Sequence, residues 1–161
     1  MLDAGTYERE LRPLLGKAAG YARSLVGNRH DADDAIQQAA LRGWERIGQY
    51  DLRRPFGGWW FAILRNSCLD LLRGRKASRA DTLDGIDPPD TNDAGTFDWS
   101  RLDAGLRRVS EAHQEILRLR YFGELSYDEI AEALSIPKGT VMSRLHLARK
   151  ALAEQVREEN P

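Results

Sequence analysis

Apolar residues along most of this chain recur at steps of three and four, which is the spacing of one face of an α-helix. Between residues 7 and 26, one such face holds Leu11, Leu14, Leu15, Ala18, Ala22 and Leu25. This spacing predicts a first helix, which Gly27 and Asn28 end. A second helix is predicted from near Asp31, whose carboxylate can cap its first turn. Its buried side is expected to consist of Ile36, Ala40, Trp44 and Ile47.

Two adjacent tryptophans stand near the start of a third predicted helix, which covers about residues 56–75 and follows Pro55. Neighbours on a helix point about 100° apart, so Trp59 and Trp60 do not both face one core. One indole is expected to pack inward, against Trp44. The other is either buried between helices or part of a contact surface. Cys68, the only cysteine, is interpreted as a small buried filler of this helix.

The last third of the chain predicts a helix-turn-helix. Ser126 and Glu129 fit the capping box that opens a short helix, and Pro137 interrupts the helical pattern soon afterwards. The inner residues of the short helix are Ile130, Ala131 and Leu134. Those of the helix after Pro137 are Val141, Leu145, Ala148 and Leu152. A helix, a short turn and a basic second helix form the organisation of a helix-turn-helix domain.

Charge is segregated along the chain, although the formal net charge is only −1. Residues 53–80 hold seven Lys and Arg and one acid, a local charge of +6, whereas residues 81–100 hold six aspartates and no Lys or Arg. The aspartate-rich stretch has few apolar groups, which is typical of a linker. Residues 134–152 are basic again. We therefore predict an all-α fold of two small helical domains, 1–79 and 102–161, joined by a flexible acidic linker, 80–101.

Composition narrows the class of protein. With 42% apolar and 30% charged residues, the chain has the profile of a soluble globular protein. No apolar run approaches the roughly 20 residues of a membrane helix, so we expect no membrane insertion. The first residues lack the pattern of a secretory signal. A single cysteine suits a reducing compartment, and we expect a cytoplasmic protein.

Two basic segments are candidates for binding nucleic acid. At or near the outer face of the last helix lie Lys138, Thr140, Ser143, Arg144, His146 and Arg149. A recognition helix contacts bases with its N-terminal residues and phosphates along its flanks, so this set predicts binding to duplex DNA. The alternative is a solvated basic face of a helical bundle. Residues 53–79 mix cations with aromatic rings, which suits melted DNA because unstacked bases stack on aromatic side chains.

Three motifs, in order along the chain, resemble those of bacterial sigma factors of the extracytoplasmic-function group. The first, DADDAIQQAALRGWERIGQYD, is similar to the helix of that family that docks on the RNA polymerase clamp. The second, RPFGGWWFAILRNSCLDLLRGRK, is similar to its promoter-melting and −10 segment. The third, RLRYFGELSYDEIAEALSIPKGTVMSRLHLARKAL, is similar to its −35-reading domain. The resemblance implies a region 2 domain over 1–79, a linker that threads toward the polymerase active centre, and a region 4 domain over 102–161.

Carried over position by position, the resemblance assigns two further surfaces. Binding of core RNA polymerase falls to Asp33, Asp34, Gln37 and Gln38. Recognition and melting of the −10 element fall to Arg53, Arg54, Trp60, Arg65, Asn66, Arg73 and Arg75. Asn66 and the loop 49–54 are expected to hold a flipped base. The implied partners are core RNA polymerase, promoter DNA that is duplex at −35 and melted at −10, and an inhibitory anti-sigma factor.

Three positions depart from the family pattern. The family commonly has Lys or Arg where this chain has Met142, and Arg where it has Leu147. The resemblance therefore leaves Lys138 and His146 to replace part of the expected base contacts. Trp60 stands where a smaller aliphatic residue is usual. With the family-typical Trp59 expected in the core, Trp60 either enlarges that core or presents an edge to the polymerase or the opened strand.

Other classes of protein fit the sequence less well. A dimeric helix-turn-helix regulator that works without polymerase would leave residues 53–79 and the acidic linker without a role. An enzyme is not expected, since the chain has no Gly-rich phosphate loop and Asp33 and Asp34 diverge on a helix. We expect no catalytic residues, no metal ion and no cofactor.

Overall fold

The computed structural model describes residues 2–79 and 99–158. Within these ranges all regular structure is helical, which confirms the predicted all-α fold for this part of the chain. Its elements are α1 (Ala4–Leu11), η1 (Arg12–Leu14), α2 (Leu15–Val26), α3 (Arg29–Glu45), η2 (Ile47–Gln49), α4 (Phe56–Arg79), α5 (Trp99–Arg108), α6 (Glu111–Tyr121), α7 (Tyr127–Leu134) and α8 (Lys138–Glu158). Most of the predicted linker, residues 80–98, lies outside the described residues.

Pro13 divides the first predicted helix into α1, the 3-10 turn η1 and α2. Its ring locks φ and it has no N–H, so the chain tightens into a 3-10 turn at this point. α2 ends at Gly27, whose φ of 89° is left-handed and suits glycine. The cap of α3 is Asn28, because its Oδ1 accepts a hydrogen bond from the backbone N–H of Asp31 at 2.9 Å. The predicted cap, Asp31, lies instead inside the first turn.

The buried side of α3 differs from the prediction. Its inner residues are Ala32, Ala35, Ala39 and Gly43. Trp44, which was expected among them, is 41% exposed, whereas Ile47 is buried as predicted. The prediction followed the large apolar residues, but α3 packs through its small ones. A Cβ atom at Gly43 would meet the hydroxyl of Tyr7 and would lie 3.1 Å from Cδ1 of Trp60, so the glycine leaves room for both aromatic side chains.

Trp60 is the central indole of the first domain. It is fully buried, together with Phe61, Leu64 and Cys68 of the same helix. This burial selects one of the two alternatives for Trp60: the side chain enlarges the core. A fully buried indole has no edge to offer to DNA, so the assignment of Trp60 to the −10 surface is wrong in this structure. The physical reason is Gly43, which leaves space on α3 for a larger side chain than the usual aliphatic one.

Trp59 lies at the border of the same core. It is half-buried, and its ring lies 5.0 Å from the ring of Tyr50 and 5.7 Å from that of Phe56. These contacts place Trp59 in an aromatic cluster beside the loop 49–54. The two tryptophans therefore point in different directions, as their positions on a helix require.

Cys68 is fully buried on the inner side of α4, as expected of a filler. Desolvation raises the pKa of its thiol to about 12. The thiol is therefore protonated at neutral pH, and the reactive thiolate is suppressed.

The second domain contains the predicted helix-turn-helix. Ser126 and Glu129 form the capping box of α7: Ser126 Oγ accepts from the Glu129 backbone N–H at 3.1 Å, and Glu129 Oε1 accepts from that of Ser126 at 3.0 Å. Ser135 ends α7 with a left-handed φ of 54°, and Pro137 precedes α8. α8 packs on α5, α6 and α7. Its fully buried residues are Val141, Leu145 and Ala148.

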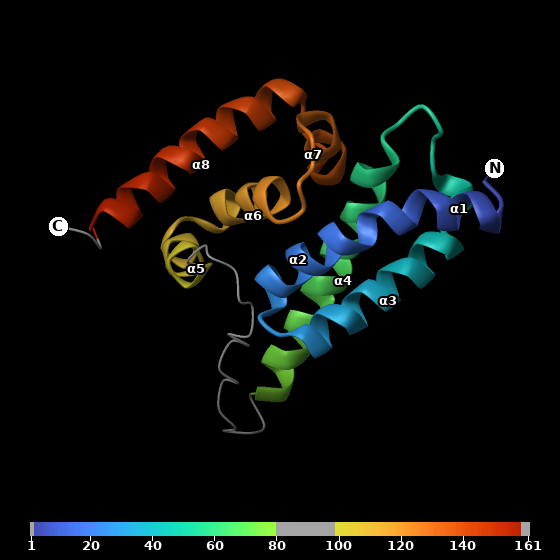
Figure 1. Cartoon of the computed structure of the whole chain (residues 1–161), viewed down its shortest axis with the longest axis horizontal. Helices are drawn as coiled ribbons and strands as arrows, with labels where there is room; N and C mark the ends of the chain where they lie inside the picture. Colours follow the sequence, from blue (N-terminus) through green and yellow to red (C-terminus); the bar gives the residue numbers. More distant parts are fainter. Residues whose placement is uncertain (1, 80–98, 159–161) are drawn as a thin grey trace.

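The two domains pack against each other (Figure 1). α7 lies against α4, and α6 lies beside α2. Buried side chains from both domains form one continuous cluster. We call this packing the closed arrangement. The sequence pattern predicts two domains and a tether, and it contains no local signal for a contact between them.

Replacing Trp60 with Ala is expected to lower the free energy of unfolding by about 3–5 kcal/mol, the usual cost of removing a buried large aromatic side chain. Leu52→Ala is the control, because Leu52 is 62% exposed and its truncation is expected to change stability by about 0.5 kcal/mol or less. Urea denaturation followed by circular dichroism measures both. Equal stability of Trp60→Ala and the wild-type chain would contradict the core position of this indole.

Candidate nucleic-acid and polymerase interfaces

The exposed side of α8 holds most of the residues predicted to bind duplex DNA. Val141, Leu145 and Ala148 face the core, so the other sides of the helix face solvent. Along these sides the exposed candidates are Lys138, Ser143, Arg144, His146 and Arg149, and Thr140 is half-buried in the first turn. α8 therefore brings the predicted set onto one helix, spread around its solvent sides.

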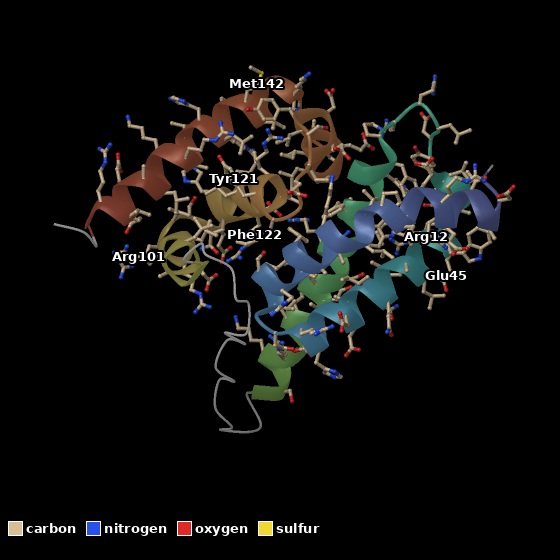
Figure 2. All side chains as sticks on the ribbon, viewed as in Figure 1. Arg12, Glu45, Arg101, Tyr121, Phe122 and Met142 are labelled. Atoms are coloured by element: carbon tan, nitrogen blue, oxygen red, sulfur yellow. The ribbon has the colours of Figure 1, made fainter. Side chains whose placement is uncertain are left out.

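Arg149 is held in place by the side chain of Tyr121, labelled in Figure 2. Its Nε donates a hydrogen bond to the Tyr121 hydroxyl at 2.6 Å, and its guanidinium lies 5.7 Å from the centre of that ring. This hydrogen bond raises the pKa of Arg149. At the start of α8, Lys138 Nζ lies 3.3 Å from Asp128 Oδ1. The two terminal cations of the set are therefore already paired with neighbouring side chains.

The cations predicted for the −10 surface are also paired within the chain. Arg73 Nη1 lies 3.2 Å from Asp70 Oδ1. Arg75 pairs with Asp31 and donates to the carbonyl oxygen of Val26 at 2.7 Å, so it connects α4 to the start of α3. Asn66 is exposed on the same helix.

Arg53 and Asp51 form a local pair in the loop before α4. Arg53 Nη2 lies 3.1 Å from Asp51 Oδ2, and Arg53 also donates a backbone hydrogen bond to Asp51 at 3.0 Å. Hydrogen bonding from Arg53 lowers the pKa of the Asp51 carboxyl. The loop that is expected to hold a flipped base therefore has its own internal charge pair.

Two of the predicted −10 cations bind acids of the second domain. Arg54 Nη1 lies 3.4 Å from Glu132 Oε1 on α7. Arg65 on α4 pairs with Glu115 on α6. Both pairs cross between the domains, so the closed arrangement occupies part of the predicted −10 surface with carboxylates.

A pair of glycines at the start of α4 forms the closest contact between the domains. A Cβ atom at Gly58 would lie 2.5 Å from the backbone oxygen of Glu129 and 2.7 Å from Cβ of Glu132, and one at Gly57 would meet the Glu129 carboxylate. A real Cβ atom would require α7 to move, because part of the obstacle is backbone. Glycine at these positions therefore allows α7 to lie directly on α4.

Arg118 connects α6 to α2 at the other end of the interface between the two domains. Its guanidinium is buried and donates to the backbone oxygen of Ser24 at the end of α2. Desolvation lowers the pKa of Arg118, and Asp103 of α5 lies 4.0 Å away as the opposing charge. A buried cation with a carbonyl partner from the other domain is costly to separate unless water replaces that partner.

The face predicted to bind polymerase is a continuous exposed side of α3. All four predicted residues, Asp33, Asp34, Gln37 and Gln38, are exposed. The same side continues with Leu41, which is 54% exposed, and Trp44, which is 41% exposed. The sequence analysis missed these two residues on this face. Leu41 follows Gln37 by four residues and Trp44 follows Leu41 by three, which was available as a signal. The same kind of spacing, counted from Ala40, had assigned Trp44 to the core.

Three potential metal ligands come together at the start of α3, where His30, Asp31 and Asp34 each have one donor atom within 4.8 Å of the others. The sequence analysis did not consider this combination. Asp31 already pairs with Arg75 and accepts a hydrogen bond from Asn28 at 3.0 Å, and the imidazole of His30 lies 3.5 Å from Asp34. These carboxylates have protein partners, so the cluster is accounted for by local pairing.

Comparison with known proteins identifies both domains. The family model for sigma-70 region 2 matches residues 7–78, and that for sigma-70 region 4 matches residues 100–152. The chain is 31% identical over 151 residues to the extracytoplasmic-function (ECF) RNA polymerase sigma factor SigW of Bacillus subtilis, covering 83% of this chain and 80% of that protein. It is 31% identical over 148 residues to the ECF sigma factor SigL of Mycobacterium tuberculosis, covering 86% of this chain and 81% of that protein.

Solved structures share the fold of the whole chain. The sigma factor RpoE from Bartonella quintana, in complex with the anti-sigma factor NepR, superposes with a TM-score of 0.74 at 24% identity and covers 96% of this chain and 98% of that one. CnrH in complex with the cytosolic domain of CnrY has a TM-score of 0.73 at 23% identity and covers 98% of this chain and 92% of that one.

The fold and the matched domains define a transcription initiation factor of the sigma-70 type. More particularly, the chain belongs to the ECF RNA polymerase sigma factors. It binds core RNA polymerase and directs promoter recognition, promoter melting and transcription initiation. The family matches support this function over the alternative of a regulator that works without polymerase. Among the helices of the described ranges, none combines the length and apolar character needed to cross a membrane.

Replacing Gly58 with Leu is expected to separate the two domains without unfolding either, because the atoms nearest to a Cβ at this position all belong to α7. Gly74→Leu is the matched control on the same helix, since a Cβ atom at Gly74 meets nothing within 4 Å. Small-angle X-ray scattering should show a larger radius of gyration for Gly58→Leu than for the control, with equal helical content by circular dichroism. An unchanged radius of gyration would contradict the tight fit of α7 on α4.

Proposed function

We propose that the exposed sides of α8 form the −35 interface, in the second of the two domains, 102–161. The observation that supports this assignment most directly is the solvent-facing set Lys138, Ser143, Arg144, His146 and Arg149 on the second helix of a helix-turn-helix. Arg144 and His146 are positioned to reach base edges or phosphates, and Arg149 reaches a phosphate from the flank. Thr140 and Ser143 supply short polar groups near the start of the helix.

We propose that the first domain, 1–79, binds the melted −10 element along α4 and the loop before it. Asn66 is the candidate for the flipped base, since its amide both donates and accepts hydrogen bonds and its side chain is exposed. The cations of this surface are Arg53, Arg54, Arg65, Arg73 and Arg75. Trp60 is not among these residues, but Trp59 is half-buried and its ring lies 5.0 Å from that of Tyr50 in the same loop.

We propose that core RNA polymerase binds the exposed side of α3. Asp33, Asp34, Gln37 and Gln38 supply its polar groups, and Leu41 and Trp44 supply apolar area in the same row. Exposed apolar side chains grouped with polar ones are typical of a surface that another protein covers. α3 lies on the far side of the first domain from α7 and α8 (Figure 1), and the residues of this face are exposed, so the closed arrangement leaves it accessible.

We propose that the free protein adopts the closed arrangement before it binds polymerase. Arg54 and Arg65 bind carboxylates of the second domain in this form, and DNA phosphates compete for the same guanidinium groups. One structural neighbour, RpoE of Bartonella quintana, was solved with the anti-sigma factor NepR, and we propose a partner of that kind for this chain. We further propose that the protein acts in the cytoplasm and has no catalytic step of its own, the polymerase supplying the chemistry.

Arg144→Ala is expected to weaken −35-dependent initiation about tenfold, since a good side-chain contact to a base contributes about 1–3 kcal/mol. Run-off transcription with core polymerase on promoters with and without the −35 element measures this loss. Arg157→Ala is the matched control, as Arg157 is exposed in the last turn of the same helix. Unchanged dependence on the −35 element in Arg144→Ala would refute the assignment of this interface.

Asn66→Ala is expected to slow the formation of open complexes while leaving affinity for core polymerase unchanged, because the flipped base loses its hydrogen-bond partner. Permanganate footprinting measures the opened strand, and fluorescence anisotropy of the labelled protein measures polymerase binding. A loss of stability in urea denaturation would instead identify Asn66 as a structural residue. Equal footprints for the variant and the wild-type chain would remove it from the −10 interface.

A further inference from the structure

Two large apolar side chains stand exposed on α8. Met142 is 54% exposed and Leu147 is 55% exposed, although both lie on a helix whose inner face is already filled by Val141, Leu145 and Ala148. Figure 2 shows Met142 at the outer edge of the molecule, on the side of α8 away from α6. We call Met142 and Leu147 the apolar pair. Each side chain therefore keeps about half of its surface open to solvent.

Met142 and Leu147 lie on either side of the most solvent-facing part of α8. Ser143 and His146 lie between the members of the apolar pair, which are five residues and therefore about 7.5 Å apart along the helix axis. Five residues at about 100° each also turn the two side chains about 140° apart, so the apolar pair stands on the two flanks of the outward side of α8. Gly139, one turn earlier on the outward side, has open space around it. Because Gly139 has no side chain, a wall of the DNA groove can approach the helix backbone at this position.

The charge around the apolar pair identifies the class of partner. Residues 133–153 contain no Asp or Glu. Their Lys and Arg residues are Lys138, Arg144, Arg149 and Lys150. An apolar surface within a segment that carries Lys and Arg but no acidic residue suits a ligand that is both polyanionic and locally apolar. In the major groove of DNA the thymine methyl group is the apolar feature of the base edges, whereas Lys and Arg donate to guanine.

We propose that Met142 and Leu147 each contact a thymine methyl group in the −35 element, and so favour A·T pairs at two separate positions. This inference rests on the proposed role of α8 and adds the base preference of that interface. Arg144, Arg149 and Lys138 remain as the contacts to phosphates or other bases.

The test uses holoenzyme assembled from the full chain and core RNA polymerase. Promoters are selected from a library randomised over the −35 element, and each thymine of the selected element is then replaced by uracil, which removes only the methyl group. For the wild-type chain, uracil at two positions is expected to lower promoter affinity about fourfold each, the effect of losing one buried methyl group. Met142→Ala should abolish the uracil effect at one position and Leu147→Ala at the other.

Val156→Ala is the control, because Val156 is an exposed apolar residue, 42% accessible, near the C-terminal end of the same helix. It should keep both uracil effects. If uracil has no effect in the wild-type chain, or the same effect in Met142→Ala and Leu147→Ala, the thymine contacts are refuted. A loss of affinity for core polymerase in these variants without DNA would also overturn the proposal, since the apolar pair would then contact protein.

Arg144→Ala distinguishes this failure from a failure of the proposed −35 interface. If it weakens binding to the −35 element while uracil has no effect, α8 contacts the promoter without reading thymine methyl groups. If neither change affects binding, α8 is not the −35 interface, and the proposed function fails together with the inference.

Discussion

The direct contact between α4 and α7 at Gly58 is the constraint on which the closed arrangement depends. Backbone approaches backbone there, so that even a methyl group would displace α7. Because α7 lies so close to α4, Glu132 reaches Arg54, and α6 is placed so that Glu115 reaches Arg65. Carboxylates and phosphates bind guanidinium groups in the same way. Arg54 and Arg65 are thus paired with carboxylates, which carry the same sign of charge as the phosphates of DNA.

The surfaces of this sigma factor differ in how far the closed arrangement covers them. The exposed side of α3 and the outer sides of α8 face solvent, so the proposed polymerase and −35 contacts are accessible while the domains are packed together. Arg54 and Arg65 on the proposed −10 surface are engaged with the second domain. On the proposed assignments, binding to polymerase and duplex does not require the domains to separate first, whereas contact of melted DNA with Arg54 and Arg65 does.

Local sequence patterns predicted the elements more reliably than their packing. The helical periodicity and the capping box of Ser126 and Glu129 report short-range interactions, and both were confirmed. The inner face of α3 was missed because alanine and glycine leave no signal in a pattern of large apolar residues, and the burial of Trp60 depends on that face. The basic character of the candidate interfaces was readable from composition. The partners of Arg54 and Arg65 were not, since they lie 78 and 50 residues away along the chain.

The burial of Cys68 restricts how signals reach this protein. Peroxides and disulfides react with an exposed thiolate, and the sulfur of Cys68 is protonated and enclosed by the first domain. Sulfenic acid formation, glutathionylation and mixed disulfides therefore have no access to this sulfur while the domain is folded. If oxidative stress controls the promoters that this chain serves, the cysteine that is oxidised belongs to another protein. Its oxidation then affects this chain through the gain or loss of a binding partner.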